Sequence, residues 1–251
     1  MAEKLYARPR SLLPLSNNFC PGCMHALATK LIAECIEELD AMEKVINVLP
    51  VGCATMNSLY WKLDMVTSAH GRAPAVATGI KRCRPDSLVI TYQGDGDLAS
   101  IGLSEILMAA NRGEHITVIF ANNSTYGMTG GQMAPTTLIG QKSTTCIYGR
   151  DPETMGYPLK MCELIEELEA PVFVARYALN SPANMRRAKD GIRKAMQIQL
   201  DGGGFTFVEL LTNCPTNWHM SPVQTLQYME ENTMKYFPCK VFVDKTAKGG
   251  A

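Results

Sequence analysis

The chain has 251 residues, and 24 basic residues balance 24 acidic ones. This length suits one large α/β domain with a full core, and a net charge of zero argues against a nucleic-acid-binding protein. The apolar stretches are too short to span a membrane, and no apolar segment of a secretory signal follows MAEKLYARPR. We therefore expect a single domain over 1–251 with short extensions at both ends, in the cytoplasm, with neither a membrane nor a nucleic acid as partner.

Helical periodicity alternates along the chain with short apolar, β-branched runs. The patterns predict helices at His25–Leu39, Pro74–Arg84, Leu98–Asn111, Lys160–Leu168 and Ala183–Leu200, and strands at Val45–Leu49, Leu88–Tyr92, Ile116–Ala121, Val172–Tyr177 and Phe205–Leu211. This alternation is typical of an α/β fold with a mostly parallel sheet and helices on both faces. Ligands in such folds bind at the carboxyl ends of the strands. The site is therefore expected in the segments after the strands, Pro50–Cys53, Gln93–Asp97, Asn122–Gly131 and Thr212–Thr216.

The segment Gln93–Asp97 contains a Gly-Asp-Gly motif between an expected strand and an expected helix. Glycines let the backbone approach a diphosphate, and the N-terminus of a helix favours its negative charge. A carboxylate at this position repels phosphates unless a cation lies between them. Asp95 is therefore explained as a ligand of Mg²⁺ that bridges to the diphosphate. The amide oxygen of Asn123 and the carbonyl of Thr125, past the next strand, are expected to complete the coordination shell.

Two other interpretations of this motif remain. Gly94-x-Gly96-x-x-Ala99 also fits the dinucleotide fingerprint, but that fingerprint needs an acidic residue at the end of the second strand, where this chain has Asn122 and Asn123. The motif could also be an ordinary turn, since Gly and Asp are common turn formers. The Gly-Asp-Gly motif alone would favour the ordinary turn. Combined with the two asparagines, across one helix and one strand, it favours a diphosphate site.

The Gly-Asp-Gly motif followed by a spaced Asn-Asn pair resembles the motif of thiamine-diphosphate enzymes. Tyr126–Gln132, Val51-Gly52-Cys53 and His70-Gly71-Arg72 resemble the 2-oxoacid:ferredoxin oxidoreductase branch of those enzymes, and the similarity runs from about Asn18 to Phe242. The resemblance implies the thiamine-diphosphate-binding fold and the β subunit of an enzyme of the branched-chain 2-oxoacid or 2-oxoglutarate type. It implies cofactor contacts from Val51, Gly52, Cys53, Ala54, His70, Gly71, Arg72, Ala73, Gly94, Asp95, Gly96, Asp97, Gly127 and Met128.

Three of the expected site residues carry nitrogen donors or bases. His25 and His70 are expected to contact the cofactor as catalytic residues. Arg72 is expected to donate to the diphosphate, although a solvated charge is the simpler interpretation. His115 and His219 are expected to be structural or surface residues.

Nine cysteines are many for a cytoplasmic chain of this length. The pair Cys20 and Cys23 could be a redox pair or half of a zinc site, but no second C-x-x-C follows and no strand precedes it. Cys53 and Cys214 each follow an expected strand, at the same edge of the sheet. Iron–sulfur cubanes take four thiolates, which can come from scattered loops, and the resemblance implies these four cysteines as cluster ligands. The remaining five, Cys35, Cys83, Cys146, Cys162 and Cys239, are expected to be structural.

The resemblance also implies an activity and partners. The activity is oxidative decarboxylation of a 2-oxoacid to acyl-CoA and CO₂, with electrons passing through a 4Fe-4S cluster to ferredoxin. The partners are an α-type subunit that supplies the activating glutamate and much of the substrate pocket, small γ and ferredoxin-like δ subunits, ferredoxin and coenzyme A. Met56 and Met128 favour an aliphatic, branched-chain 2-oxoacid, and 2-oxoglutarate and pyruvate stay open. A non-redox thiamine-diphosphate enzyme, without need of the four cysteines, and a non-catalytic dinucleotide-binding module also stay open.

Overall fold

The computed structural model describes residues 6–246. Within this range a seven-stranded sheet has the order β2-β1-β3-β4-β8-β7-β9. The strands are β1 (Val45–Leu49), β2 (Asp64–Thr67), β3 (Leu88–Gly94), β4 (Thr117–Asn122), β7 (Phe173–Ala178), β8 (Thr206–Leu211) and β9 (Val241–Asp244). All neighbouring pairs are parallel except β7 and β9, which are antiparallel. The expected mostly parallel sheet is confirmed, and its central strands β4 and β8 are buried at every position, as strands covered on both faces must be.

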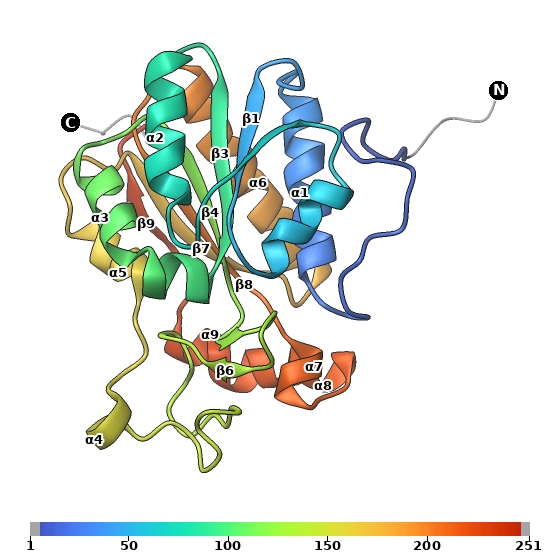
Figure 1. Ribbon diagram of the computed structural model, residues 1–251, viewed down its shortest axis with the longest axis vertical. Helices are drawn as coiled ribbons and strands as arrows, with labels where there is room; N and C mark the ends of the chain where they lie inside the picture. The colour runs from blue at the N-terminus through green and yellow to red at the C-terminus, as the bar shows by residue number, and fades with distance from the viewer. Residues whose placement is uncertain (1–5, 247–251) are drawn as a thin grey trace.

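Helices cover both faces of the sheet (Figure 1). On one face lie α1 (His25–Glu38) and α6 (Pro182–Leu200); on the other lie α2 (Ala73–Cys83), α3 (Leu103–Asn111) and α5 (Met161–Glu166). Each face has its own apolar core, one around Ile32 and Ile192 and the other around Ile106 and Phe120. Four of the five predicted helices form as single helices.

The helix expected over Leu98–Asn111 is divided in the structure. A π-helical segment, η2 (Gly96–Ile101), precedes α3, and Gly102 lies between them. A Cβ at Gly102 would lie 2.4 Å from the carbonyl oxygen of Gly71, so the turn before α2 packs directly on this break. The interruption therefore brings the loop that precedes α2 against the Gly-Asp-Gly segment.

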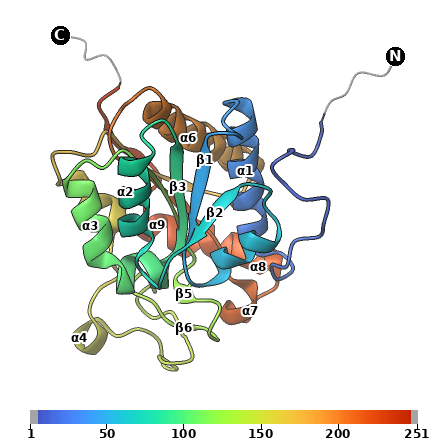
Figure 2. The ribbon, with the colours of Figure 1, turned by 45° about the horizontal axis from the view of Figure 1, so that its top comes forward.

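The remaining elements gather beyond the carboxyl ends of the parallel strands (Figures 1 and 2). They are the 3-10 helix η1 (Cys53–Leu59), the hairpin of β5 (Thr125–Tyr126) and β6 (Gln132–Met133), the helices α4 (Pro152–Met155), α7 (Pro215–Trp218), α8 (Pro222–Tyr228) and α9 (Met234–Tyr236), and the π-helical η3 (Met229–Thr233). None of the helices formed by residues 6–246 is long and apolar enough to cross a membrane.

A buried ion pair joins two neighbouring strands near this end. Arg176 on β7 and Glu209 on β8 have fully buried side chains, and Arg176 Nε donates to Glu209 Oε2 at 2.8 Å. The guanidinium also donates to Glu163 on α5, at 2.6 Å. The other oxygen of Glu209 accepts from Asn122 Nδ2 at 2.8 Å. The chain of contacts therefore runs from the outer helix layer to the last residue of β4.

Candidate active site

Two adjoining cavities lie at the carboxyl ends of the strands. The larger has a volume of about 470 Å³ and is lined from the loops after β1, β3 and β4. The smaller, of about 210 Å³, is lined by the segment before α1 and the segments after β1, β4 and β8. Five residues line both: His25, Cys53, Asn123, Gly127 and Met128. Ligands bound in the two cavities would therefore be separated by no more than one layer of residues.

Asp95 lines the larger cavity. Its carboxylate is 2% exposed and accepts hydrogen bonds from Gly96 N at 2.9 Å, Thr125 N at 3.1 Å and Thr136 Oγ1 at 2.8 Å. Burial raises the pKa of Asp95 to about 7, although these donors act against the rise. Within residues 6–246 it forms no salt bridge, so this carboxyl group has no cationic partner there.

The turn after β4 presents oxygen atoms beside Asp95. Asn122 Oδ1 accepts from Ser124 N, and Asn123 Oδ1 accepts from Thr125 N, both at 3.2 Å. Ser124 has a φ of 60°, in the left-handed region. Trp218 Nε1 fixes the turn further by donating to the carbonyl of Asn123 at 3.0 Å. Asp95, Asn123 and Thr125, the expected Mg²⁺ ligands, thus lie together.

Gly96 is required by a close contact. A Cβ on Gly96 would lie 2.3 Å from Cε1 of the Tyr126 ring. The hydroxyl of Tyr126 is in turn 3.5 Å from the carbonyl of Gly96, and Tyr126 itself lines the larger cavity. Gly96 therefore leaves room for the Tyr126 ring in the cavity wall. The sequence predicted only that this glycine lets the backbone approach a diphosphate.

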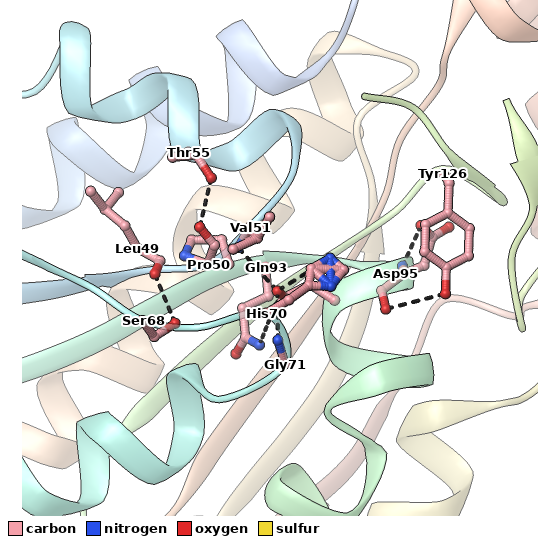
Figure 3. Close-up of polar contacts among 12 residues, drawn as sticks. Leu49, Pro50, Val51, Thr55, Ser68, His70, Gly71, Gln93, Asp95 and Tyr126 are labelled. Atoms are coloured by element: carbon pink, nitrogen blue, oxygen red, sulfur yellow. Dashed lines mark hydrogen bonds and ion pairs between the residues drawn. The ribbon is translucent and has the colours of Figure 1, made fainter. Parts of the chain in front are cut away.

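Asp97 connects two loops and strand β3 around the larger cavity. Its Oδ1 accepts from Val51 N at 3.0 Å and Gly71 N at 2.9 Å, and its Oδ2 accepts from Gln93 Nε2 at 2.7 Å. Figure 3 shows Val51, His70, Gly71 and Gln93 close together around these contacts. Asp97 therefore holds the loops that follow β1 and precede α2 in fixed positions beside the cavity.

The two expected catalytic histidines differ in their surroundings. His25 is buried, lies with Nδ1 2.6 Å from the hydroxyl of Tyr92, and stacks on Phe19. Burial lowers the pKa of His25 to about 4, so its ring is neutral near pH 7. His70 lines the larger cavity, with Nε2 3.8 Å from Asp97 Oδ1. Both rings reach the cavity, and their catalytic roles stay predictions.

Four thiols surround the smaller cavity: Cys20, Cys23, Cys53 and Cys214. A Cβ on Gly127 would lie 3.1 Å from Cys53 Sγ and 3.8 Å from Cys214 Sγ, so this glycine lets the two sulfurs approach the loop after β4. Burial raises the pKa of both Cys23 and Cys53 to about 12. Within residues 6–246 no group of three or more His, Cys, Asp or Glu side chains is placed so that it could hold a metal ion.

The family of the chain follows from its comparison with known proteins. Residues 50–210 match the protein family described as "Thiamine pyrophosphate enzyme, C-terminal TPP binding domain". The 2-oxoglutarate synthase subunit KorB of Methanocaldococcus jannaschii is 35% identical, over 94% of this chain and 85% of that protein. The chain belongs to the thiamine-diphosphate-binding subunits of the 2-oxoacid:ferredoxin oxidoreductase family.

Other relatives in this oxidoreductase family extend the comparison. The ketoisovalerate oxidoreductase subunit VorA of Methanothermobacter thermautotrophicus is 48% identical over 99% of this chain but only 54% of its own length. The chain thus spans about half the length of this relative. A 2-oxoglutarate:ferredoxin oxidoreductase from Magnetococcus marinus has the same fold, with a TM-score of 0.79, 24% identity, and 96% and 86% of the two chains covered.

Most of the residues that the resemblance to this oxidoreductase family implied line one cavity, and their contacts with a cofactor stay predictions. Eleven of the fourteen expected cofactor contacts line the larger cavity: Val51, Gly52, Cys53, Ala54, His70, Gly94, Asp95, Gly96, Asp97, Gly127 and Met128. Gly71, Arg72 and Ala73 do not. Arg72, with a side chain 47% exposed, forms an ion pair with Glu105 on α3. The expectation that Arg72 faces the diphosphate is therefore not supported, because a nearby carboxylate binds the guanidinium.

Some details of the family site differ from the expectations or were missed. Of the five cysteines expected to be structural, Cys35, Cys146 and Cys162 are buried, whereas Cys83 and Cys239 are exposed and do not pack in the core. Met56 lines the smaller cavity instead of the larger one, which leaves Met128 as the methionine beside the expected cofactor. Thr136 and Asn217 were missed, because each is a polar residue in an irregular segment or short helix, without a motif to mark it.

Proposed function

We propose that the chain binds thiamine diphosphate, Mg²⁺ and a 4Fe-4S cluster, as a subunit of a 2-oxoacid:ferredoxin oxidoreductase that forms acyl-CoA and CO₂. The observation that carries the proposal is the pair of adjoining cavities, one with an unpaired carboxylate and the other with four thiols. A thiamine-diphosphate enzyme without redox chemistry would have no need of the four thiols. All nine cysteines are free thiols, which suits a reducing compartment such as the cytoplasm.

The larger cavity suits a magnesium diphosphate. Asp95, the side chain of Asn123 and the carbonyl of Thr125 are hard oxygen ligands of the kind that Mg²⁺ prefers. A bound divalent cation would be a positively charged partner for the buried carboxylate of Asp95. The backbone at Gly94 leaves space for a ligand, since a Cβ there would meet nothing within 4 Å.

The smaller cavity suits an iron–sulfur cubane better than a single zinc ion. Its four thiols come from three separate parts of the chain and face one space of about 210 Å³. Zinc ligands converge on one point at about 2.3 Å from each sulfur. A cubane keeps its four thiolates farther apart.

Each part of the site has a distinct task in this proposal. When bound, thiamine diphosphate supplies a carbanion for attack on the keto carbon and an electron sink for decarboxylation. Asp97 holds the loops that carry Val51 and Gly71, and neutral His25 separates the two cavities. Cys53 lines both cavities and would place the cluster close enough to the cofactor for electron transfer.

An aliphatic, branched-chain 2-oxoacid fits this chain best as the substrate. The larger cavity is lined by Val51, Ile101 and Met128, and none of its described lining residues is a lysine or arginine. 2-Oxoglutarate carries a second carboxylate, for which such a cation would be the usual partner. The 48% identity to a ketoisovalerate oxidoreductase subunit agrees with this choice, against 35% to a 2-oxoglutarate synthase subunit.

The proposed enzyme needs further chains. An α-type subunit would supply the glutamate that activates the aminopyrimidine and much of the substrate pocket, with small γ and ferredoxin-like δ subunits beside it. Coenzyme A would take the acyl group and ferredoxin the electrons. The Magnetococcus relative carries 2-oxoglutarate, coenzyme A and succinyl-CoA, which supports coenzyme A as a ligand of the proposed complex.

Calorimetry tests the metal part of the proposal. Asp95→Asn keeps the size of the side chain and removes its charge, and it should abolish Mg²⁺-dependent binding of thiamine diphosphate. Asp86→Asn, an exposed change outside both cavities, should bind as the wild type does. Unchanged affinity in Asp95→Asn would contradict a metal bridge at this carboxylate. Iron and acid-labile sulfide analysis of the anaerobically purified wild type tests the cluster, and a chain without iron would instead be a non-redox subunit.

A further inference from the structure

One side chain donates to a thiol of the smaller cavity. Asn217, on α7, places Nδ2 3.3 Å from Cys214 Sγ and 2.9 Å from the carbonyl oxygen of Gly127. The backbone N–H of Asn217 also donates to the same sulfur. Cys214 therefore accepts two hydrogen bonds from one residue, and the second contact of that residue reaches the loop that lines both cavities.

The fold enforces this position of Asn217. Cys214 directly precedes α7, so the first turn of the helix brings Asn217 back over the sulfur. On its other side, a Cβ at Gly131 would lie 2.9 Å from Asn217 Cβ, and Gly131 has a φ of +84°. A glycine in the turn between β5 and β6 is thus needed to make room for Asn217.

The other three thiols of the cavity have different surroundings. Cys23 accepts a backbone hydrogen bond from His25. Within residues 6–246, no side-chain N–H donates to Cys20, Cys23 or Cys53, so Cys214 is the one that has such a donor. The sulfur of Cys214 therefore accepts more hydrogen bonds than the other three sulfurs of the cavity.

We propose that Asn217 is a positioning residue that raises the reduction potential of the cluster through its side-chain N–H to Cys214. On reduction the cluster takes up one electron, and the negative charge on its thiolate ligands increases. A hydrogen bond to a ligand sulfur stabilises the more negative state, so it favours the reduced cluster. The proposal rests on the proposed function, because it needs a cluster held by Cys214.

Redox measurements on the anaerobically purified, iron-loaded chain test this role. Asn217→Ala removes the side-chain donor and keeps the backbone N–H, and Asn217→Asp replaces the donor by an oxygen of similar size. The matched control is Asn18→Ala, which changes an exposed asparagine that lines the same cavity and has no hydrogen bond to sulfur. The cluster is reduced with dithionite at a series of fixed potentials, and the reduced form is counted by electron paramagnetic resonance.

The expected result is a lower potential in both Asn217 variants. At a fixed potential the ratio of reduced to oxidised cluster should fall about tenfold in Asn217→Ala, as for the loss of one hydrogen bond to a charged acceptor. For one electron this is a shift of about 59 mV. Asn217→Asp should shift further, because it adds a negative charge, while Asn18→Ala should shift much less.

Other outcomes overturn the inference in separate ways. Equal potentials in wild type and Asn217→Ala, with full iron content, would show that the side chain does not tune the cluster. Loss of iron from both Asn217 variants but not from Asn18→Ala would show that Asn217 retains the cluster instead of tuning it. Absence of iron from the wild type would refute the proposed function itself, and this inference with it.

Discussion

Glu209→Ala should cost the domain a large part of its stability. The change removes one of the two carboxylates around the fully buried Arg176 and takes the acceptor from Asn122 Nδ2. A buried ion pair that loses one partner leaves an uncompensated charge, which costs about 3–5 kcal/mol. Glu163 also pairs with Arg176, but its side chain is 30% exposed. Glu163→Ala should therefore cost only about 1 kcal/mol, as expected near a surface.

Urea denaturation followed by far-UV circular dichroism measures both changes. The urea concentration at the midpoint of unfolding should fall in Glu209→Ala, while the slope of the free energy of unfolding against urea stays constant. A lower midpoint at constant slope marks a change in stability. A double variant, Arg176→Met with Glu209→Leu, should recover much of the loss, because well-packed apolar groups can replace a buried ion pair. A free energy of unfolding for Glu209→Ala within about 1 kcal/mol of wild type would refute the reasoning, since such a loss is typical of an exposed pair.

Three further predictions concern the cluster, the partner subunit and pH. Cys214→Ser should lose or degrade the brown chromophore, whereas Cys35→Ser, in the core, should keep it; equal iron contents would contradict the ligand assignment. The isolated chain should reduce no viologen dye with any 2-oxoacid and coenzyme A until an α-type subunit is added, because a positioned partner group is missing; dye reduction by the pure chain would place that group here. Burial raises the pKa of Glu163, but hydrogen bonding and the charge of Arg176 outweigh it and lower the pKa overall. The excess stability of wild type over Glu163→Gln should therefore be present at pH 7 and decline as acid protonates Glu163 in the folded state; a difference independent of pH would contradict this.

The parallel strands and the loops after them could be predicted from sequence because burial on both faces leaves a continuous apolar run. The edge strands β2 and β9 have only four residues each and are partly exposed, so neither shows such a run. The break at Gly102 depends on a tertiary contact with Gly71, and no local pattern in the helix predicts it.

The candidate site shows the same division. Asp95 and Asn123 were found because each follows a buried strand and carries a functional group that a diphosphate site requires. Thr136 donates to Asp95 from 41 positions away, and a lone threonine in a loop gives no signal. Arg72 was assigned to the diphosphate from the resemblance of His70-Gly71-Arg72 and from its charge, whereas its ion pair with Glu105 depends on the packing of α2 against α3.

The residues shared by the two cavities also restrict which mutations can accumulate in the evolution of such a protein. Cys53 and Gly127 belong to both spaces, so a mutation at either position alters two sites at once. A descendant that gave up electron transfer could discard Cys20, which lines only the smaller cavity, at little cost to the larger one. Replacing Cys53 by a bulkier residue would reshape the cofactor cavity as well. Loss of the cluster in a lineage is therefore expected to begin at Cys20, Cys23 or Cys214, which line only the smaller cavity, and to reach Cys53 last.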